Sequence, residues 1–386
     1  MAPLDLPFSM DEYRNRLARV QAAMSERKLD VLLIHTPENT YYLTGYRTIG
    51  YYSYAALIVP KDRDPIHLNR AIEKSVVEGT SWVPGQIVYQ DTEHYLDATV
   101  RALRQEGLDR GRIGIDKQAW YLTIGDYEAL RERLPQVAFV DAAMLVDDIR
   151  IVKSPAEQAY SRRAGRIASD AMRHCLAAIR PGMTELELQA EAYGALLRGG
   201  SEYQGLPPLI NTGVRATMAH ATAEGRRIEQ GDVVYLEMAA SVKRYHAAVL
   251  RCAWVGQPPA RAVQMTDVCR RALEAGIAMM KPGVPCEEVD RACRKVVEDA
   301  GYGASFRHKA GYSIGIALPP DWSEARAIML RGGEKRELRP GMIFHILPAC
   351  IEYRDHCVGV SHTVLITETG HEVLTDVEEK LFVVGG

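Results

Sequence analysis

The sequence predicts two domains: an α/β domain over residues 1–150, and an α+β domain with an internal pseudo-twofold repeat over residues 151–386. Three observations support this prediction. Strand and helix patterns alternate through the first 150 residues, which is typical of an α/β domain. A strongly capped helix start follows, and the remaining sequence then contains two pairs of similar segments, which indicate two similar halves.

The first domain begins with an amphipathic helix pattern over residues 10–28, followed by an apolar run that predicts a buried strand over residues 30–34. Pro37 lies in the next stretch, residues 36–39, which we interpret as a turn. The remaining patterns predict strands over residues 55–59 and 86–89 and helices over residues 94–106 and 125–133. These elements alternate up to about residue 150.

The domain boundary is marked by a helix start signal. Residues 149–153 read as a short strand, and Ser154 is the expected N-cap of a helix that continues to about residue 179. Pro155 occupies the first helical position, where its missing N–H costs nothing. Glu157 stands three residues after the cap, as in a capping box.

The second domain contains an internal repeat. PGMTELELQAEA (181–192) resembles PGVPCEEVDRAC (282–293), and each copy predicts a Pro-Gly turn before an amphipathic helix. RRIEQGDVVYLEMAA (226–240) resembles RELRPGMIFHILPAC (336–350), and a glycine opens a strand in each copy. Two such halves would pack about a pseudo-twofold axis, and the seam between them is a natural place for a site. In this register Glu237 stands opposite Leu347.

The segment GDVVYLEMAASVKRYHAAVLR (231–251) predicts a β-hairpin with a short basic turn. Strand alternation places Glu237 on the same face as Val233, Tyr235 and Ala239, and the residues between them on the other face. Desolvation raises the pKa of a lone carboxyl in such a wall unless a cationic ligand compensates. Glu237 is therefore a candidate functional residue. The alternative is a structural role, through a hydrogen bond or a pair with Arg251 or Lys243.

Composition narrows the functional class. The chain has 386 residues, a net charge of −3 and 25% charged residues, so nothing indicates the basic face of a nucleic-acid-binding protein. No basic segment precedes an apolar stretch at the N-terminus, and no apolar run is long enough to span a bilayer. The seven scattered cysteines contain no CxxC pair, which favours reduced thiols over disulfides or a zinc ribbon. We expect a cytoplasmic protein without nucleic-acid or membrane partners.

Several of these segments together resemble the pita-bread superfamily of methionine aminopeptidases, prolidases and creatinase. Residues 10–150 are similar to the N-terminal domain of the prolidase and creatinase branch, whose members are dimers. The resemblance implies a pita-bread catalytic domain over residues 151–386 and a homodimer. The segments that carry it are IRIVKSPAEQ, the two Pro-Gly helix units, GDVVYLE, AGYSIGI, LRPGMIFHILP and GVSHTVLITETG.

The metallopeptidases of this superfamily hold two divalent metals with two Asp, one His and two Glu. One carboxylate cannot hold two metals, and the nearby histidines, His345, His356 and His362, lack a recognisable ligand spacing. We therefore expect no metal and no other cofactor. The resemblance places the five ligand positions at Glu237, Ala248, Tyr312, Leu347, and at or next to Ser361.

Two metal-free relatives suggest another chemistry. The stretch around His220 is similar to creatinase, which implies that His220 is a general acid/base, but creatinase's substrate-binding carboxylates fall at Leu250 and Leu347. Ectoine hydrolases resemble the chain more fully, with a Glu at the first ligand position and a following Lys-Arg-Tyr-His. This resemblance implies a metal-independent hydrolase that opens a small cyclic amidine. Ectoine or hydroxyectoine would give N-acetyl-diaminobutyrate, with Glu237 as nucleophile or base and His220 as proton shuttle.

Five further residues are candidates for binding the small-molecule substrate: Tyr312, Tyr52, His345, His362 and Trp322. Tyr52 belongs to an aromatic cluster at residues 50–54 that could cover a cationic ring by cation–π contact, although a core or interface role is the alternative. Tyr312 could donate a hydrogen bond to substrate or fill vacated space. Three other functions stay open: a creatinase-like amidinohydrolase, a prolidase-like Xaa-Pro peptidase and a non-catalytic pseudoenzyme.

Overall fold

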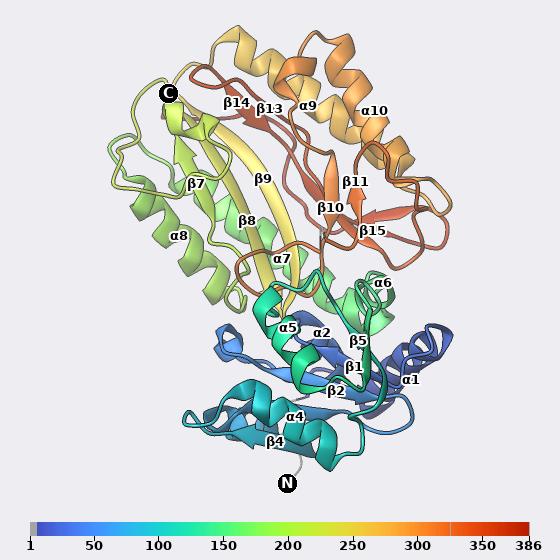
Figure 1. The fold of residues 1–386 in the computed structure, drawn as a ribbon. Helices are drawn as coiled ribbons and strands as arrows, with labels where there is room; N and C mark the ends of the chain where they lie inside the picture. The colour runs from blue at the N-terminus through green and yellow to red at the C-terminus, as the bar shows by residue number, and fades with distance from the viewer. Residues whose placement is uncertain (1–5, 325, 386) are drawn as a thin grey trace. The chain divides into compact units, whose positions relative to one another are not determined.

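The computed structural model describes residues 6–324 and 326–385 (Figure 1). Contacts within the chain divide it into two compact units, Met1–Arg150 and Ile151–Gly386. Among the described residues, no helix combines the length and apolarity needed to cross a bilayer. All seven cysteines are buried free thiols.

The first unit is built around a six-stranded mixed sheet in the order β4-β3-β2-β1-β5-β6. β1 is antiparallel to β2 and parallel to β5, so the sheet is not a simple parallel α/β sheet. Apolar residues of the central strands and of α4 and α5 form its core, with Leu33, Leu103, Ile113 and Leu130 fully buried. The elements are α1 (Met10–Glu26), β1 (Val31–Ile34), α2 (Pro37–Thr44), β2 (Ala56–Pro60), β3 (Ile66–Arg70), α3 (Lys74–Thr80), β4 (Gly85–Tyr89), α4 (Tyr95–Gln105), β5 (Gly111–Ile115), α5 (Ile124–Arg133), β6 (Val137–Asp141) and α6 (Asp147–Arg150), with 3-10 turns η1 (Gly50–Tyr52) and η2 (Ala71–Glu73).

Two local predictions in this region are wrong. Residues 36–39 do not form a turn, because Pro37 begins the eight-residue helix α2, which ends at Gly45 in the left-handed conformation. Pro at the first helical position favours a helix start as much as a turn. Residues 149–153 are not a strand either: Arg150 ends the short helix α6, and Val152 forms only an isolated bridge to Met342.

The second unit contains a four-stranded sheet in the order β17-β9-β8-β7 and a five-stranded sheet in the order β11-β10-β12-β15-β16. Its first helix, α7 (Pro155–Ala178), has the expected N-cap, with Ser154 and Glu157 forming a complete capping box. The other elements are α8 (Glu185–Arg198), β7 (Leu209–Thr212), η3 (Gly213–Thr217), β8 (Val233–Val242), β9 (Tyr245–Val255), α9 (Ala260–Met279), α10 (Cys286–Asp299), η4 (Gly303–Ser305), β10 (Gly311–Ser313), β11 (Met329–Leu330), β12 (Ile343–Ile346), β13 (Ala349–Ile351), β14 (Cys357–Gly359), β15 (His362–Ile366), β16 (His371–Val373) and β17 (Phe382–Val384).

The internal repeat is confirmed element by element. Gly182 and Gly283 have φ values of 85° and 82° in the turns that precede α8 and α10. Gly231 and Gly341 both have φ of 88° shortly before β8 and β12. This left-handed conformation favours glycine because a Cβ would be strained there. Figure 1 shows α7 and α8 with the β8–β9 sheet, and α9 and α10 with the second sheet.

The predicted hairpin is also confirmed. β8 and β9 pair antiparallel over their whole length, and Lys243 and Arg244 form a two-residue turn with φ of 47° and 65°. Positive φ at both positions is what a type I′ hairpin turn requires. Arg244 is held there by its guanidinium, which donates to the carbonyl oxygens of Tyr203 and Ala317.

The two halves of the second unit meet where β9 faces the segment that leads into β15. The backbone N–H of Leu250 donates to Ser361 Oγ at 2.7 Å, and the N–H of Ala248 donates to Thr363 Oγ1 at 2.9 Å. Thr363 Oγ1 in turn donates to the carbonyl oxygen of Ala248 at 2.8 Å. Two hydroxyl side chains therefore supply partners for buried backbone groups of β9, which would be costly to leave unpaired.

Removing one of these hydroxyls should weaken the seam. We expect Thr363→Val to lower the free energy of unfolding by about 1–3 kcal/mol, because both backbone groups of Ala248 lose their Thr363 partner in a buried setting. Chemical denaturation measures this change. The matched control is Thr222→Val in an exposed irregular segment, which should change stability by no more than about 0.5 kcal/mol. Equal effects of the two substitutions would contradict the role given to the seam.

Candidate active site

Glu237 lies in the middle of β8, on the face that turns away from helices α7 and α8. The alternation predicted for this strand is confirmed, since Val234, Leu236, Met238 and Ala240 pack into the core formed with those helices. Tyr235 and Glu237 belong to the opposite face, and the Glu237 side chain is only 7% exposed. The sheet thus presents a nearly buried carboxyl group toward the second half of the unit.

Within the described part of the structure, Glu237 has one short hydrogen bond and no ion pair with Lys or Arg. The Tyr235 hydroxyl donates to Glu237 Oε2 at 2.7 Å. Burial raises the pKa of Glu237 to about 7; the Tyr235 hydrogen bond lowers it and the nearby Asp321 charge raises it. Among the described residues the only basic group within 4.0 Å is His345, whose Nδ1 is 4.0 Å from Glu237 Oε1. The alternative of a pair with Arg251 or Lys243 has no such contact to support it.

A chain of hydrogen bonds beside Glu237 links four side chains. His345 Nδ1 lies 2.9 Å from the Tyr312 hydroxyl, and His345 Nε2 lies 2.7 Å from Ser361 Oγ. The indole Nε1–H of Trp322 also donates to the Tyr312 hydroxyl, at 2.9 Å. Tyr312 is close enough to Glu237 that the carboxylate charge, after burial, raises the pKa of the phenol well above 10.

His345 is a neutral imidazole in this arrangement. Burial first, and then the nearby His362 and Arg251, lower its pKa to about 3. A neutral ring has one N–H donor and one acceptor nitrogen. His345 therefore links Tyr312 to Ser361 without carrying a charge of its own.

The other predicted site residues occupy different surroundings. His362 is buried and hydrogen-bonded to Thr375 Oγ1 and to Glu379 Oε1, at 2.8 and 3.0 Å. Tyr52 is 79% exposed on the 3-10 turn η1 of the first unit. His220 is exposed on a turn after η3, and among the described residues it forms no hydrogen bond or ion pair with Glu237. The structure thus groups Tyr312, His345 and Trp322 with Glu237. His362 lies near His345 but hydrogen-bonds to Thr375 and Glu379 instead, and Tyr52 belongs to the first unit.

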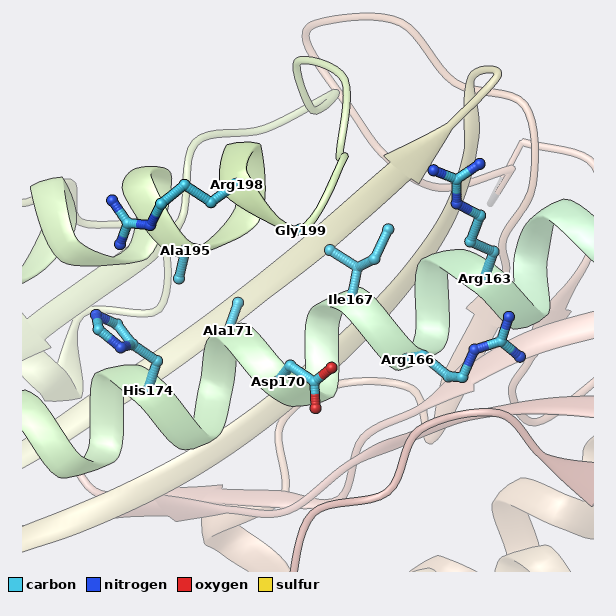
Figure 2. Close-up of a pocket in the computed structure, with 9 residues that line it drawn as sticks. All are labelled: Arg163, Arg166, Ile167, Asp170, Ala171, His174, Ala195, Arg198 and Gly199. Atoms are coloured by element: carbon cyan, nitrogen blue, oxygen red, sulfur yellow. The ribbon is translucent and has the colours of Figure 1, made fainter.

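Helices α7 and α8 form an open groove elsewhere on the second unit (Figure 2). Arg163 and Arg166 project from α7, and Arg198 projects from α8. Asp170 and His174 on the same wall are engaged with Arg173 and Glu191 respectively. None of the predicted site residues lines this groove, so it is separate from the cluster around Glu237.

Comparison with known proteins identifies the family. The model of metallopeptidase family M24 matches residues 159–368, more than half of the chain, and that of the creatinase/prolidase N-terminal domain matches residues 16–152. The chain belongs to metallopeptidase family M24. This family assignment agrees with the pita-bread fold expected from the sequence, and it makes the protein a member of a family of hydrolases.

Three family relatives match nearly the full length of the chain. Ectoine hydrolase from Halomonas elongata is 31% identical over 99% of this chain and 100% of its own. The Xaa-Pro dipeptidase from Pyrococcus horikoshii is 26% identical over 96% of this chain and 100% of its own. The crystal structure of a prolidase from Thermococcus sibiricus superposes with a TM-score of 0.87 at 22% identity, over 98% of this chain and all of that chain, which establishes the fold.

The residues present do not fit the two-metal centre that the family name implies. At the five ligand positions inferred above, Ala248 and Leu347 have no ligand atom, and Tyr312 and Ser361 are engaged with His345. Among the described residues, no three His, Cys, Asp or Glu donors converge on Glu237. The one such group lies in the β13–β14 region, and its Glu352 is already held by Arg261 and Ser305.

Two residues of the cluster received no role from the sequence. Tyr235 shares the strand face of Glu237 two residues away, and that spacing was a usable signal for a hydrogen bond. For Ser361 the sequence indicated only that it stands at or next to a metal-ligand position of the superfamily. Its contact with His345 joins residues 16 positions apart on antiparallel segments, so no local pattern could reveal it.

Glu237 should make the protein less stable at high pH. Its folded-state pKa of about 7 lies above the ordinary value of 4.5, so ionisation disfavours the folded state as pH rises through this window. We expect Glu237→Gln to gain stability relative to the wild type between pH 4.5 and 7, by roughly 3 kcal/mol at the upper end. Denaturant unfolding at pH 5 and pH 8 measures the difference.

The control for this experiment is Glu324→Gln. Glu324 forms an ion pair with Lys153, and both side chains are fully buried. Removing that charge leaves the Lys153 ammonium without its carboxylate, so the control should destabilise the protein at both pH values. If Glu237→Gln has a lower free energy of unfolding than the wild type at pH 8, then burial does not destabilise the ionised Glu237 carboxylate, and the raised pKa is contradicted.

Proposed function

We propose that the protein is a metal-independent hydrolase that opens a small cyclic amidine, with ectoine or hydroxyectoine as the substrate. The observation that carries the proposal is Glu237, a buried carboxyl that has no Lys or Arg partner among the described residues and whose metal-ligand companions are replaced. An amidinium ring is a cation that pairs with a single carboxylate, and its central carbon is already electrophilic. The full-length similarity to an ectoine hydrolase supports the same substrate class.

The chemistry requires one group that takes a proton from water or attacks carbon itself. In the first route, Glu237 removes a proton from a water whose oxygen bonds to the amidinium carbon, and the C=N π electrons move to the ring nitrogen. Protonated Glu237 then gives up the proton, which the proposed shuttle His220 delivers to a ring nitrogen. The C–N bond breaks with its electron pair on that nitrogen, and the hydroxyl left on carbon loses its proton to become the amide oxygen.

In the second route, Glu237 is the nucleophile. A carboxylate oxygen bonds to the amidinium carbon, one ring C–N bond breaks with its electron pair on the nitrogen, and that nitrogen takes a proton from the proposed shuttle, His220. Water then hydrolyses the bond between Glu237 and the substrate, which releases the same N-acetyl product. Both routes need ionised Glu237 in the free enzyme, and both need a proton donor for the leaving nitrogen.

The proposal predicts ectoine turnover that depends on Glu237 and not on metal. Product formation followed by NMR should be unaffected by a chelator, and Glu237→Gln should lower the rate by roughly 100- to 10,000-fold. The value of kcat/KM should rise with pH and reach half its maximum near pH 7, because Glu237 must lose its proton. Stoichiometric bound metal together with chelator-sensitive cleavage of an Xaa-Pro dipeptide would overturn the proposal in favour of a prolidase.

His220 is the proposed proton shuttle, and its exposed position makes this role testable by comparison. We expect His220→Ala to lower kcat for ectoine by about 100-fold, because a positioned acid/base contributes on that scale. The matched control is His174→Ala on α7, an exposed histidine paired with Glu191, which should leave kcat unchanged. If the two variants behave alike, the proton must reach the leaving nitrogen by another group.

A further inference from the structure

The hydrogen-bond chain beside Glu237 has two possible directions, and burial distinguishes them. In one direction Ser361 Oγ–H donates to His345 Nε2, and His345 Nδ1–H donates to the Tyr312 hydroxyl. In the other, both donors are reversed. Each direction leaves one hydroxyl proton without an acceptor among the described residues. The favoured direction is the one in which this unsatisfied donor costs less free energy.

The reversed direction would leave the orphan proton on Ser361. Ser361 Oγ already accepts the N–H of Leu250 at 2.7 Å, so an additional hydrogen bond from His345 would fill its acceptor sites. Its own proton would then have no partner among the described residues, inside a side chain that is 0% exposed. Leaving a buried donor unsatisfied is costly, which argues against this direction.

The forward direction leaves the free proton on Tyr312. The Tyr312 oxygen then accepts two hydrogen bonds, from Trp322 Nε1–H and from His345 Nδ1–H. The Tyr312 hydroxyl can then act only as a hydrogen-bond donor. Tyr312 is partly exposed, whereas Ser361 is fully buried. The orphan donor therefore lies where a ligand next to Glu237 can accept it.

We propose that Ser361 and His345 are positioning residues that fix the Tyr312 hydroxyl as a hydrogen-bond donor to the substrate. The acceptor is the oxygen that is added to the amidine carbon, which gains negative charge as its hydroxyl proton leaves and the amide forms. Tyr312 donates a hydrogen bond to this oxygen and keeps its own proton, so no bond to Tyr312 is made or broken. The identity of the acceptor rests on the proposed amidine hydrolysis. The direction of the hydrogen bonds from Ser361 through His345 to Tyr312 does not depend on it.

Tyr312 and Ser361, two members of the hydrogen-bond chain, stand at or next to positions where the superfamily's metal ligands were expected from the sequence. His345 joins them by bonds of 2.9 and 2.7 Å. A neutral set of hydrogen-bonded side chains, with the Tyr312 O–H left to donate, thus occupies this part of the site. A preorganised donor of this kind stabilises developing charge without reorganisation, which is the usual source of a large rate effect.

The direction of the hydrogen bonds through His345 can be measured without any substrate. In the full-length protein labelled with 15N-histidine, long-range 1H–15N spectra identify which ring nitrogen carries the proton, and His345→Gln assigns the signal. The proposal requires a neutral His345 protonated at Nδ1. Protonation at Nε2 would overturn it, because His345 would then be a donor to Ser361 and an acceptor from Tyr312.

The catalytic part is tested by a double-mutant cycle on ectoine turnover. Tyr312→Phe should lower kcat by roughly 100-fold with little change in KM, as removal of an oxyanion donor does. Ser361→Ala should lower kcat about 3- to 10-fold in the wild type and have no further effect in Tyr312→Phe, because it acts through that hydroxyl. His345→Asn, which can keep a donor near Nδ1, should retain more activity than His345→Gln.

The matched control is Tyr245→Phe, which removes a buried hydroxyl that donates to Glu157 at 2.6 Å, away from this cluster. It should lower stability and leave kcat unchanged. Unchanged kcat in Tyr312→Phe, or an equal loss from Ser361→Ala in both backgrounds, would overturn the proposal. If the wild type does not turn over ectoine while His345 is protonated at Nδ1, the amidine hypothesis fails and the direction of the chain stands.

Discussion

The site depends on how the two halves of the second unit are joined at β9. Backbone N–H groups of Ala248 and Leu250 are buried and need acceptors, and the hydroxyls of Thr363 and Ser361 supply them. These bonds hold the segment leading into β15 against β9. Because β12 pairs with β15 and β8 pairs with β9, the same contact places His345 of β12 within 4.0 Å of Glu237 of β8.

Desolvation then determines the charge state of the groups brought together. Glu237 and His345 are both buried, and burial disfavours the charged form of each, so the carboxyl pKa rises to about 7 and the imidazole pKa falls to about 3. The two groups therefore do not form an ordinary ion pair at neutral pH. A substrate cation can take the place of the missing charge, and this physical complementarity underlies the proposed amidine chemistry.

Comparison within family M24 shows how a conserved scaffold can hold a changed set of side chains. The full-length match to the Thermococcus sibiricus prolidase has a TM-score of 0.87, although the residues around Glu237 do not fit a two-metal centre. Folds of this kind host different chemistries through the residues that line the site. Similarity of fold therefore does not decide the reaction, which we propose depends on Glu237, Tyr312, His345 and Ser361.

The sequence by itself determined the features that depend on local patterns. Capping residues predicted the start of α7, paired glycines predicted the internal repeat, and alternation along 233–240 predicted which face carries Glu237. Each of these follows from the chemistry of neighbouring residues. The same local reasoning was wrong at residues 36–39, because a proline is compatible with both a turn and a helix start.

Only the tertiary structure decided which side chains surround Glu237. The links from Tyr312 to His345 and from His345 to Ser361 join β10, β12 and the segment before β15, which no periodic pattern relates. The structure also places His220 on an exposed turn and His362 in a separate network with Glu379. Contacts of this kind arise from packing between distant segments, so the sequence could nominate these residues but could not group them.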